Sequence, residues 1–460
     1  MADYLLEIGT EEIPAKFMAG ALAELQVVAE QKLQEHRIGY KSLKTMGTPR
    51  RLVLYVEDLA AFGEDLREEV RGPAKKAAFD AEGQPTKAAQ GFARSQGVTV
   101  ESLICKETGN GEYVFAQKEV KGRPAEEVLT EIVPQLIMSL NFPKPMRWGS
   151  LEMRFARPIR WLVSLLDEKV IPVEIAGLQA GKISRGHRFL GEQALEITRP
   201  QTYLAQMWEN FVLVDQEARR AECWRQIQAE AAKVQGTVEE DAELLEEVIY
   251  LIEWPTALTG NIAAEYLQMP EEVVITPMRE HQRYFPVRGR DGKLLPHFIT
   301  VRNGNADHLD IVQAGNEKVL KARLADARFF WEEDQKIKLE AYLPRLQKVV
   351  FQESLGTIAQ KAQRITKLVE CMAEKIGVEK QVTADACRAA QLAKADLVTN
   401  MVYEFPELQG IMGRYYALLS GEREAVAKAI LEHYQPRFAG DALPASLAGA
   451  LVSIADKADT

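Results

Sequence analysis

Three short runs of the sequence mix arginines with aromatic residues, and this mixture suits contact with RNA. Guanidinium groups bind phosphate oxygens through paired hydrogen bonds, while aromatic rings stack on unpaired bases. The runs lie at 146–161, 184–189 and 278–286. They provide the candidate RNA contacts Arg147, Arg154, Arg157, Arg160, Arg185, His187, Arg188, Arg279 and Arg283.

Positive charge is concentrated in one part of an acidic protein. Residues 141–190 hold nine Lys or Arg against four Asp or Glu, whereas the whole chain has a formal net charge of −10. A global negative charge argues against non-specific coating of nucleic acid but leaves room for a local patch. The alternative for each run is structural: the aromatics belong to a core, and the arginines are solvated on the opposite face of a strand. A fourth basic spot, TPRRL at 48–52, has a similar alternative, an exposed strand end.

The stretch LLEIGTEEIP at 5–14 places two acids, Glu11 and Glu12, directly after a short apolar run. These acids could contact a partner or an arginine elsewhere in the body of the protein. Alternatively a helix starts here, with Thr10 as its cap, the acids in the first turn and Pro14 tolerated near the start. We favour the helix start, because it accounts for Thr10, both acids and Pro14 together.

The common motifs of nucleotide and hydrolytic chemistry do not occur in the sequence. There is no Gly-x-x-x-x-Gly-Lys-Ser/Thr or Gly-x-Gly-x-x-Gly loop, and no Gly-x-Ser-x-Gly or His-Glu-x-x-His motif. The six histidines form no pair at metal-ligand spacing, and the four scattered cysteines indicate no disulfide framework. We therefore predict no catalytic residue, cofactor or metal in this chain, and the cysteine pattern favours a reducing cytoplasm.

The C-terminal part resembles HD-type phosphohydrolases, whose metal ligands are a His, a His-Asp pair, later histidines and a final Asp. The stretches EHYQPRFAGDALP (432–444) and ADK (455–457) carry this resemblance. The corresponding positions of this chain are Lys361, Ala395, Asp396, His433 and Asp456, so two imidazole ligands are missing. The resemblance implies an HD-like fold whose metal chemistry is lost, because Lys361 places a competing cation there. An active metal-dependent phosphohydrolase is the alternative.

Length and hydrophobic periodicity indicate an α+β protein of several domains. The 460 residues, 47% of them hydrophobic, suffice for two to four cores. The spacing predicts helices at 17–33, 86–95, 124–139, 216–233 and 244–252, and strands at 4–8, 52–56, 114–118, 161–166, 170–175 and 273–275, with a hairpin at 284–301. We predict an α+β region (1–112) with a small helical insert (about 71–100), a mixed α/β region (113–318) with a helical insert (about 199–252), and a helical HD-like domain (319–460).

Many longer stretches resemble, in order, the beta subunit of bacterial heterotetrameric glycyl-tRNA synthetase. The likeness runs from residue 4 to residue 460. Beside LLEIGTEEIP, it is carried by TPRRLVL (48–54), GPAKKAAFD (72–80), PTKAAQGFAR (85–94), MRWG (146–149), RPIRWLVSLL (157–166), RGHRF (185–189), YFPV (284–287), NEKVLKARLADARFFWEED (316–334), LGTIAQKAQRI (355–365), LVTNMVYEFPELQGIMGRYYA (397–417) and YQPRFAGDALP (434–444).

This resemblance implies a division of labour between two chains. The alpha subunit of that family activates glycine with ATP and Mg²⁺, whereas the beta subunit binds and positions tRNA(Gly) within an α2β2 enzyme. The resemblance also implies an editing-module-like region, so hydrolysis of mischarged tRNA through 113–305 is a further alternative. Family chains continue into a C-terminal anticodon-binding domain, which we expect this sequence to lack. Neither DNA nor a membrane is an expected partner.

Overall fold

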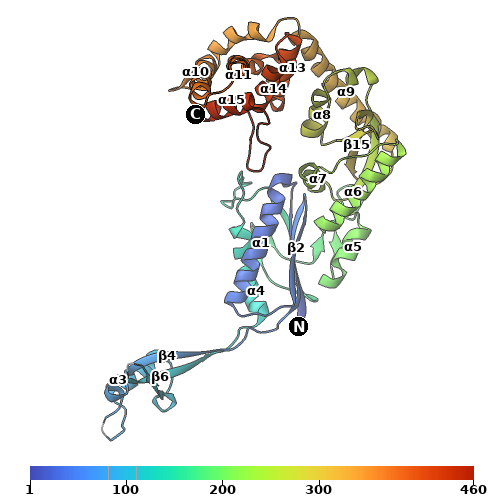
Figure 1. Cartoon of the computed structure of the whole chain (residues 1–460). Helices are drawn as coiled ribbons and strands as arrows, with labels where there is room; N and C mark the ends of the chain where they lie inside the picture. The colour runs from blue at the N-terminus through green and yellow to red at the C-terminus, as the bar shows by residue number, and fades with distance from the viewer. Residues whose placement is uncertain (81, 110) are drawn as a thin grey trace. The chain divides into compact units, whose positions relative to one another are not determined.

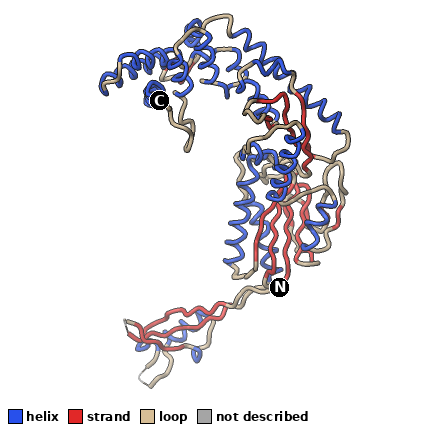
Figure 2. Tube along the Cα trace, turned by 45° about the vertical axis from the view of Figure 1, so that its right-hand side comes forward, coloured by secondary structure: helices blue, strands red, loops and turns tan. Residues whose placement is uncertain are grey.

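The computed structural model describes residues 1–80, 82–109 and 111–460, which form two compact units (Figure 1). Unit 1 comprises Met1–Arg225, Asp241–Thr256 and Arg302–Asn305; unit 2 comprises Gln226–Glu240, Ala257–Val301 and Ala306–Thr460. Helices and strands occur in both units, and Figure 2 shows the two kinds of element along the chain, so the expected mixture of α and β structure is confirmed. The division into three domains stays a prediction. No helix among the described residues is both long and apolar enough to cross a lipid bilayer.

Unit 1 is built around a five-stranded antiparallel sheet in the order β2-β3-β1-β7-β8. The sheet and its first helices are β1 (Ala2–Thr10), α1 (Ala15–Glu35), β2 (Ser42–Thr48), β3 (Arg51–Leu59), α4 (Ala125–Ser139), β7 (Ile159–Leu166) and β8 (Lys169–Val170). They are followed by β9 (Glu174–Ile175), β10 (Leu178–Gln179), β11 (Ile183–Ser184), β12 (Leu195–Glu196), η2 (Pro200–Thr202), α5 (Tyr203–Glu209), α6 (Gln216–Lys233), which continues into unit 2 after Arg225, and α7 (Ala242–Ile249).

The central strand β1 is buried on both faces, which explains its almost continuous apolar run. On one face α1 packs Met18 and Leu22 against the sheet, where Gly47 leaves space for both side chains. The other face is covered by α5, through Tyr203 and Met207. The predicted strand at 4–8 and helix at 17–33 are thereby confirmed.

Alternation along β1 places Leu5, Glu7 and Gly9 on the face that α5 covers. Gly9 lies between Arg51 of β3 and Trp161 of β7 in the ladder. A Cβ at Gly9 would lie 1.9 Å from the Trp161 ring, so glycine is needed to admit the indole. The same register brings Glu7, Arg51 and Trp161 together on one face.

A small subdomain is inserted between β3 and α4. It comprises β4 (Leu66–Ala74), α2 (Lys75–Ala78), α3 (Lys87–Gln96), η1 (Val100–Ser102), β5 (Ile104–Thr108) and β6 (Gly111–Val120), with strand order β4-β6-β5. Its own core contains Ala78, Ala89 and Val114. The two connecting segments meet at Gly63 and Gly122, where a Cβ on Gly122 would come 1.6 Å from the Gly63 carbonyl oxygen.

Unit 2 contains a three-stranded antiparallel sheet, β13 (Pro255–Asn261), β15 (Leu294–Asn303) and β14 (Phe285–Arg288), in that order. The hairpin predicted at 284–301 is confirmed, with Gly292 at a φ of +78° in its turn. The strand predicted at 273–275 was wrong, because this segment lies in the helix α8 (Glu271–Thr276). Pro270 precedes that helix, and Glu271 and Glu272 occupy its first turn, which favours a helix over the β-branched composition.

The remainder of unit 2 is mostly helical. Its elements are η3 (Ala264–Gln268), the π-helical turn η4 (Pro277–Gln282), α9 (Leu309–Asp334), η5 (Leu339–Lys348), β16 (Val350–Gln352), β17 (Gly356–Thr357), α10 (Ile358–Ile376), α11 (Lys380–Leu392), η6 (Ala395–Val398), α12 (Asn400–Glu404), η7 (Pro406–Leu408), α13 (Ile411–Leu419), α14 (Glu424–Glu432) and α15 (Leu447–Ala458). One apolar core joins Phe298 of the sheet to Leu324, Val369 and Leu451 of the helices. An HD-like fold for these helices stays a prediction.

Candidate nucleic-acid interface

The two acids of the opening motif pair with two of the predicted RNA-contact arginines. Glu11 accepts hydrogen bonds from Arg160 Nε at 2.8 Å and from Arg188 Nη2 at 2.9 Å. Glu12 Oε1 lies 3.0 Å from the same Arg188 nitrogen. Burial opposes ionisation of Glu11, but its bonds to Arg160 and Arg188 outweigh that effect and lower its pKa.

The favoured interpretation of this motif, a helix start capped by Thr10, was wrong. The helix α1 begins at Ala15 after Pro14, makes no side-chain cap and has no acid in its first turn. Instead the Thr10 amide donates to the Arg50 carbonyl at 2.8 Å, and the Glu11 amide donates to the Pro158 carbonyl at 3.1 Å. These backbone bonds fix the acids at the sheet edge where the arginines also lie.

Beneath this pair lies a buried ionic network. Arg51 Nη2 contacts Glu253 Oε1 at 3.0 Å, and Arg51 Nη1 contacts Glu7 Oε1 at 3.5 Å. Thr48 donates to Glu253 at 2.7 Å, and Ser184 donates to Glu7 at 2.8 Å. Burial disfavours the charged form of Arg51, but the carboxylates of Glu253 and Glu7 outweigh it and raise its pKa. Arg51 and Glu253 therefore stay charged although both are closed to solvent.

The basic spot at 48–52 is thus not the exposed strand end that its sequence suggested. Arg51 is fully buried, and Arg50 is 6% exposed. The guanidinium carbons of Arg50 and Arg51 lie 5.5 Å from the Trp161 ring centroid, and that of Arg185 lies 5.0 Å from it. Cations placed around an indole in this way are stabilised by its quadrupole.

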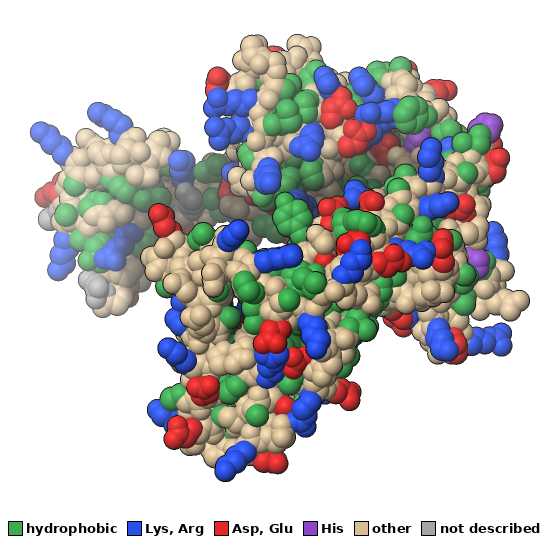
Figure 3. All heavy atoms as spheres, turned by 90° about the horizontal axis from the view of Figure 1, so that it is seen from above, with side chains coloured by type: hydrophobic (Ala, Val, Ile, Leu, Met, Phe, Trp, Pro, Cys, Tyr) green, Lys and Arg blue, Asp and Glu red, His purple; other side chains and the backbone are tan. Residues whose placement is uncertain are grey.

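The remaining candidates differ in how their charge is compensated. Arg147 pairs with Glu152 at 3.3 Å, and both side chains are largely exposed. Arg157 donates to the Ala156 carbonyl at 2.8 Å. Within the described part of the chain, no ion pair involves Arg154, Arg157 or Arg185. Figure 3 shows acidic and basic side chains interspersed over the visible face. Since many basic groups therefore have acidic neighbours, an arginine without a carboxylate partner is the better candidate for binding phosphate.

His187 has a supporting position rather than an exposed one. Its ring is 1% exposed, and its Nε2 lies 3.0 Å from Asn303 Oδ1. That oxygen also accepts the backbone N–H groups of Glu253 and Trp254, so the histidine nitrogen must be the donor. Burial lowers the pKa of His187, which keeps the ring neutral.

Arg279 and Arg283 belong to unit 2, at the π-helical turn η4. Arg279 pairs with Glu280, and Arg283 donates to the Glu280 carbonyl from a left-handed backbone with a φ of +60°. The neighbouring aromatics Tyr284 and Phe285 are 3% and 1% exposed. For this run the structural alternative therefore holds for the rings, which form core.

In the first run Trp148 is only partly buried and the other two rings form core, whereas the second run differs. Phe155 and Trp161 are buried core residues and are not available for base stacking. Phe189, in contrast, is 84% exposed beside Arg188. Among Phe155, Trp161 and Phe189, base stacking is therefore limited to Phe189.

The five HD-like positions lie in unit 2, where Lys361 and the neighbouring Lys394 both pair with the carboxylate of Asp456. Lys361 Nζ lies 3.0 Å from Asp456 Oδ1, and Lys394 Nζ lies 2.8 Å from Asp456 Oδ2. His433 Nε2 is 4.0 Å from the same Oδ2. Ala395 adds only a buried methyl group. Sequence comparison had pointed to Lys361 but missed Lys394, which stands immediately before the Ala395-Asp396 pair.

This donor set does not fit a divalent metal. Both oxygens of Asp456 already face ammonium groups, and burial with Lys394 nearby lowers the pKa of His433 to about 3. No group of three His, Cys, Asp or Glu side chains arranged to hold a metal occurs in the described ranges. Burial alone would raise the pKa of Asp456. The positive charges of the lysines outweigh burial, so the pKa of this carboxyl is lowered.

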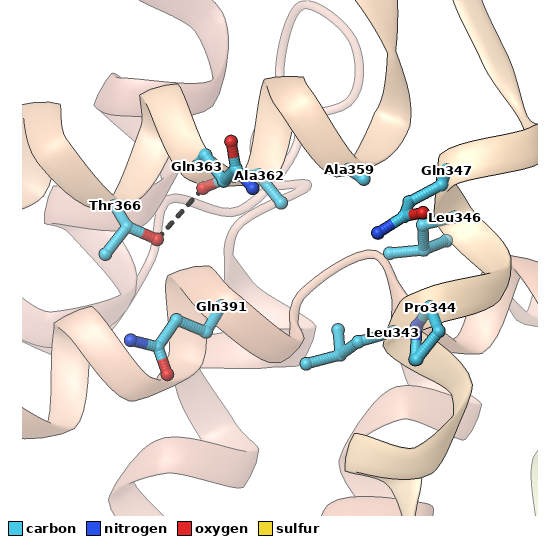
Figure 4. A pocket seen from close by; sticks show the side chains of 9 residues that line it. All are labelled: Leu343, Pro344, Leu346, Gln347, Ala359, Ala362, Gln363, Thr366 and Gln391. Atoms are coloured by element: carbon cyan, nitrogen blue, oxygen red, sulfur yellow. Dashed lines mark hydrogen bonds between the residues drawn. The ribbon is translucent and has the colours of Figure 1, made fainter.

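A nearby cavity of about 270 Å³ offers no acid or base (Figure 4). The lining side chains come from η5, α10 and α11 and are Leu343, Pro344, Leu346, Gln347, Ala359, Ala362, Gln363, Thr366 and Gln391. Thr366 donates its hydroxyl back to the Ala362 carbonyl at 2.9 Å, as the dashed line shows. None of these lining side chains is ionisable, so the cavity by itself supports no hydrolytic chemistry.

Comparison with known proteins decides the family. The profile described as "Glycyl-tRNA synthetase beta subunit" matches residues 4–460. The chain belongs to the glycyl-tRNA synthetase beta subunit family. The resemblance noted from the sequence motifs is thereby confirmed.

Individual relatives of this family agree over the whole chain. The glycine–tRNA ligase beta subunit of Moorella thermoacetica is 55% identical over 458 residues, which is 100% of this chain and 66% of the relative. That of Desulforamulus reducens is 54% identical over 458 residues, with the same two shares. That of Bacillus subtilis is 47% identical over 458 residues, or 67% of the relative. The chain thus spans about two thirds of the length of these beta subunits.

Asp396 of this family member gives a first prediction. Burial raises its pKa to about 6 although the N–H groups of Gly410 and Gly413 donate to it. Because the pKa is higher in the folded chain than in the unfolded chain, the fold is most stable when the pH is below the unfolded pKa. This stability is lost as the pH rises through about 6, the folded pKa. Asp396→Asn keeps an acceptor and removes the titration. Relative to the native chain, we expect the variant to gain about 3 kcal/mol between pH 3.5 and pH 7.

Hydrogen exchange in α13 and α14, followed in increasing urea at several pH values, gives the free energy of unfolding of this region and so measures the gain. The exposed Asp326→Asn serves as the control, with a constant difference from the native chain. An unchanged difference for Asp396→Asn would show that the carboxyl is not strained by burial.

Proposed function

We propose that the chain binds tRNA(Gly) and positions it for a separate alpha subunit, which activates glycine with ATP and Mg²⁺ in an α2β2 glycine–tRNA ligase. The match of the family profile to residues 4–460 carries this proposal. The chain spans about 66% of the length of the Moorella and Desulforamulus beta subunits, so the proposal covers only the part of a beta subunit's role that residues 1–460 can perform. The chain itself has no assigned catalytic residue, and the cytoplasm is its proposed location.

The charge distribution supports RNA as the partner. Arg154, Arg157 and Arg185 keep a guanidinium without a carboxylate in the described structure. A compensated arginine must first give up its carboxylate, so the uncompensated ones should provide most of the phosphate affinity. The compensated candidates are Arg147, Arg160, Arg188 and Arg279.

Neither hydrolytic alternative gains support from the structure. An HD-type phosphohydrolase needs a metal where Lys361 and Lys394 hold Asp456. An editing hydrolase needs an accessible nucleophile or base in 113–305, but His187 there is 1% exposed and its Nε2 donates to Asn303. We therefore propose neither activity.

Removing the uncompensated arginines tests the binding role. We expect Arg157→Ala and Arg185→Ala each to reduce the slope of log affinity against log salt by about 0.7–0.9, the value for one phosphate contact. Fluorescence anisotropy with labelled tRNA(Gly) at several salt concentrations gives the slope. Arg199→Ala, which removes an exposed arginine paired with Glu168, is the matched control and should leave the slope unchanged. Unchanged slopes for Arg157→Ala and Arg185→Ala would exclude both residues.

The division of labour has its own test. We expect the purified chain to show no glycine-dependent exchange of pyrophosphate into ATP, and the alpha subunit to supply that activity. Isotope exchange measured with each chain alone makes the comparison. Glycine-dependent ATP consumption by this chain alone would overturn the proposed roles.

A further inference from the structure

Arg50 is a buried cation with unused hydrogen-bond donors. Its side chain is 6% exposed, and neither Nε nor Nη1 has a hydrogen-bond partner in the described structure. Its ion pair with Glu253 Oε2 is long, at 3.7 Å. The hydroxyl of Thr10, 1% exposed, also lacks a partner. Glu253 Oε2 lacks a hydrogen-bond partner as well, so Arg50 keeps a positive charge that this carboxylate compensates only loosely.

The two acids of the opening motif lie close to this cation. Burial lowers the pKa of Arg50, and the charges that act on it include Arg188 and Glu12. Arg188 is the residue that Glu11 and Glu12 share, and Arg160 binds the other oxygen of Glu11. Two carboxylates therefore meet three arginines at one edge of the sheet.

These surface pairs are weak enough to be exchanged. The side chains of Arg160 and Arg188 are 50% and 39% exposed, and those of Glu11 and Glu12 are 33% and 53% exposed. Exposed pairs of this kind contribute little to stability. A phosphate of an RNA chain makes a similar contact and also releases condensed counterions. A polyanion can therefore displace the acids where a small anion gains too little.

We propose that Glu11 and Glu12 occupy the places of RNA phosphates in the free chain. A phosphodiester of tRNA displaces them and binds Arg160 and Arg188, with the positive charges of Arg185 and Arg50 behind. The acids keep the guanidinium groups oriented before RNA arrives and raise the threshold for weaker anions. This inference rests on the proposed tRNA binding and names the residues that control it.

Neutralising the acids tests the inference on the full chain. We expect the double variant Glu11→Gln, Glu12→Gln to bind a tRNA(Gly) transcript about threefold to tenfold more tightly at 0.15 M salt, because the surface ion pairs no longer compete with phosphate for the arginines. We also expect a salt slope steeper by about one to two, since Arg160 and Arg188 are freed for phosphate. Anisotropy titrations at several salt concentrations measure both quantities.

Two further variants separate a local effect from a general change in charge. Glu168→Gln removes a carboxylate from the exposed pair with Arg199 and should tighten binding much less. Adding Arg188→Gln to the double variant should remove most of its advantage, because both acids pair with that arginine and only Glu11 also pairs with Arg160. Glu12→Gln alone, at the more exposed acid, gives an intermediate gain and covers the case in which the double variant unfolds.

The outcomes distinguish this inference from the proposed function. If the native chain binds tRNA(Gly) and the double variant binds no better than Glu168→Gln, the acids are structural clamps and the inference is wrong. If neither the native chain nor the variant binds tRNA(Gly), tRNA binding itself is wrong. If the variant changes association with the alpha subunit but not with tRNA, the arginines serve a protein partner, and the inference is again wrong.

Discussion

Glu253→Gln is expected to lower the free energy of unfolding of unit 1 by about 3–5 kcal/mol at pH 7, the cost of breaking a buried ion pair. The carboxylate is 1% exposed and lies 3.0 Å from Arg51 and 3.7 Å from Arg50. Its loss leaves Arg51 with Glu7 alone, at 3.5 Å, and Arg50 with no counterion among the described residues. Burial raises the pKa of Glu253, but Arg51 and Arg50 outweigh it and lower that pKa.

The lowered pKa fixes the direction of the pH dependence. A carboxyl whose pKa is lower in the folded chain stabilises the fold when the pH is above its pKa in the unfolded chain, about 4.3. This stability is lost as the pH falls through the pKa of the folded chain. The deficit of Glu253→Gln should therefore shrink below about pH 4. Urea unfolding combined with hydrogen exchange in β3 measures it.

Glu246→Gln is the matched control for this change. Glu246 pairs with Arg220 at 3.0 Å, but its side chain is 47% exposed, so its removal should cost less than about 1 kcal/mol. Equal costs for the two substitutions would mean that the buried network contributes no more than a surface pair.

Local pattern was sufficient for most elements of the fold. The helix predicted at 216–233 has the observed bounds of α6, and the hairpin turn follows from Gly292. The prediction of a strand at 273–275 was wrong because it gave the three β-branched residues more weight than the helix-start signal, which is Pro270 followed by two acids in the first turn of α8. The error was one of competing local signals, and the acids could have decided it.

The sites depend on contacts that no local pattern encodes. Glu11 meets Arg160 across 149 positions and Arg188 across 177 positions. Arg51 meets Glu253 across 202 positions, so a sequence shows only a basic strand start. The local sequence around Glu11 and Glu12 is compatible with a helix cap. In the folded chain the strand pairing instead places Arg160 and Arg188 beside these acids, and the acids pair with them. Lys394 was missed because Ala395 had been aligned with the lost metal ligand.

Asp456→Asn should have a comparably large effect on unit 2. The side chains of Lys361 and Lys394 are 4% and 6% exposed, and both depend on this carboxylate. Lys361 keeps Asp459 at 3.3 Å, whereas Lys394 keeps no ion-pair partner in the part of the chain described. We expect the free energy of unfolding to fall by about 3–5 kcal/mol at pH 7, because a buried charge is left uncompensated. Glu404→Gln, which breaks the exposed pair with Arg323, should cost less than about 1 kcal/mol.

The response to pH identifies the uncompensated lysine as the cause. Burial lowers the pKa of Lys394 even with Asp456 present, so folding disfavours the charged amine relative to the unfolded chain. Without Asp456 this effect grows, and raising the pH neutralises the amine in the folded state before the unfolded one. The deficit of Asp456→Asn should therefore decrease from pH 7 towards pH 10, and adding Lys394→Met should recover part of it at pH 7. Hydrogen exchange in α15 reports both changes; a deficit that is independent of pH would assign the loss to packing instead.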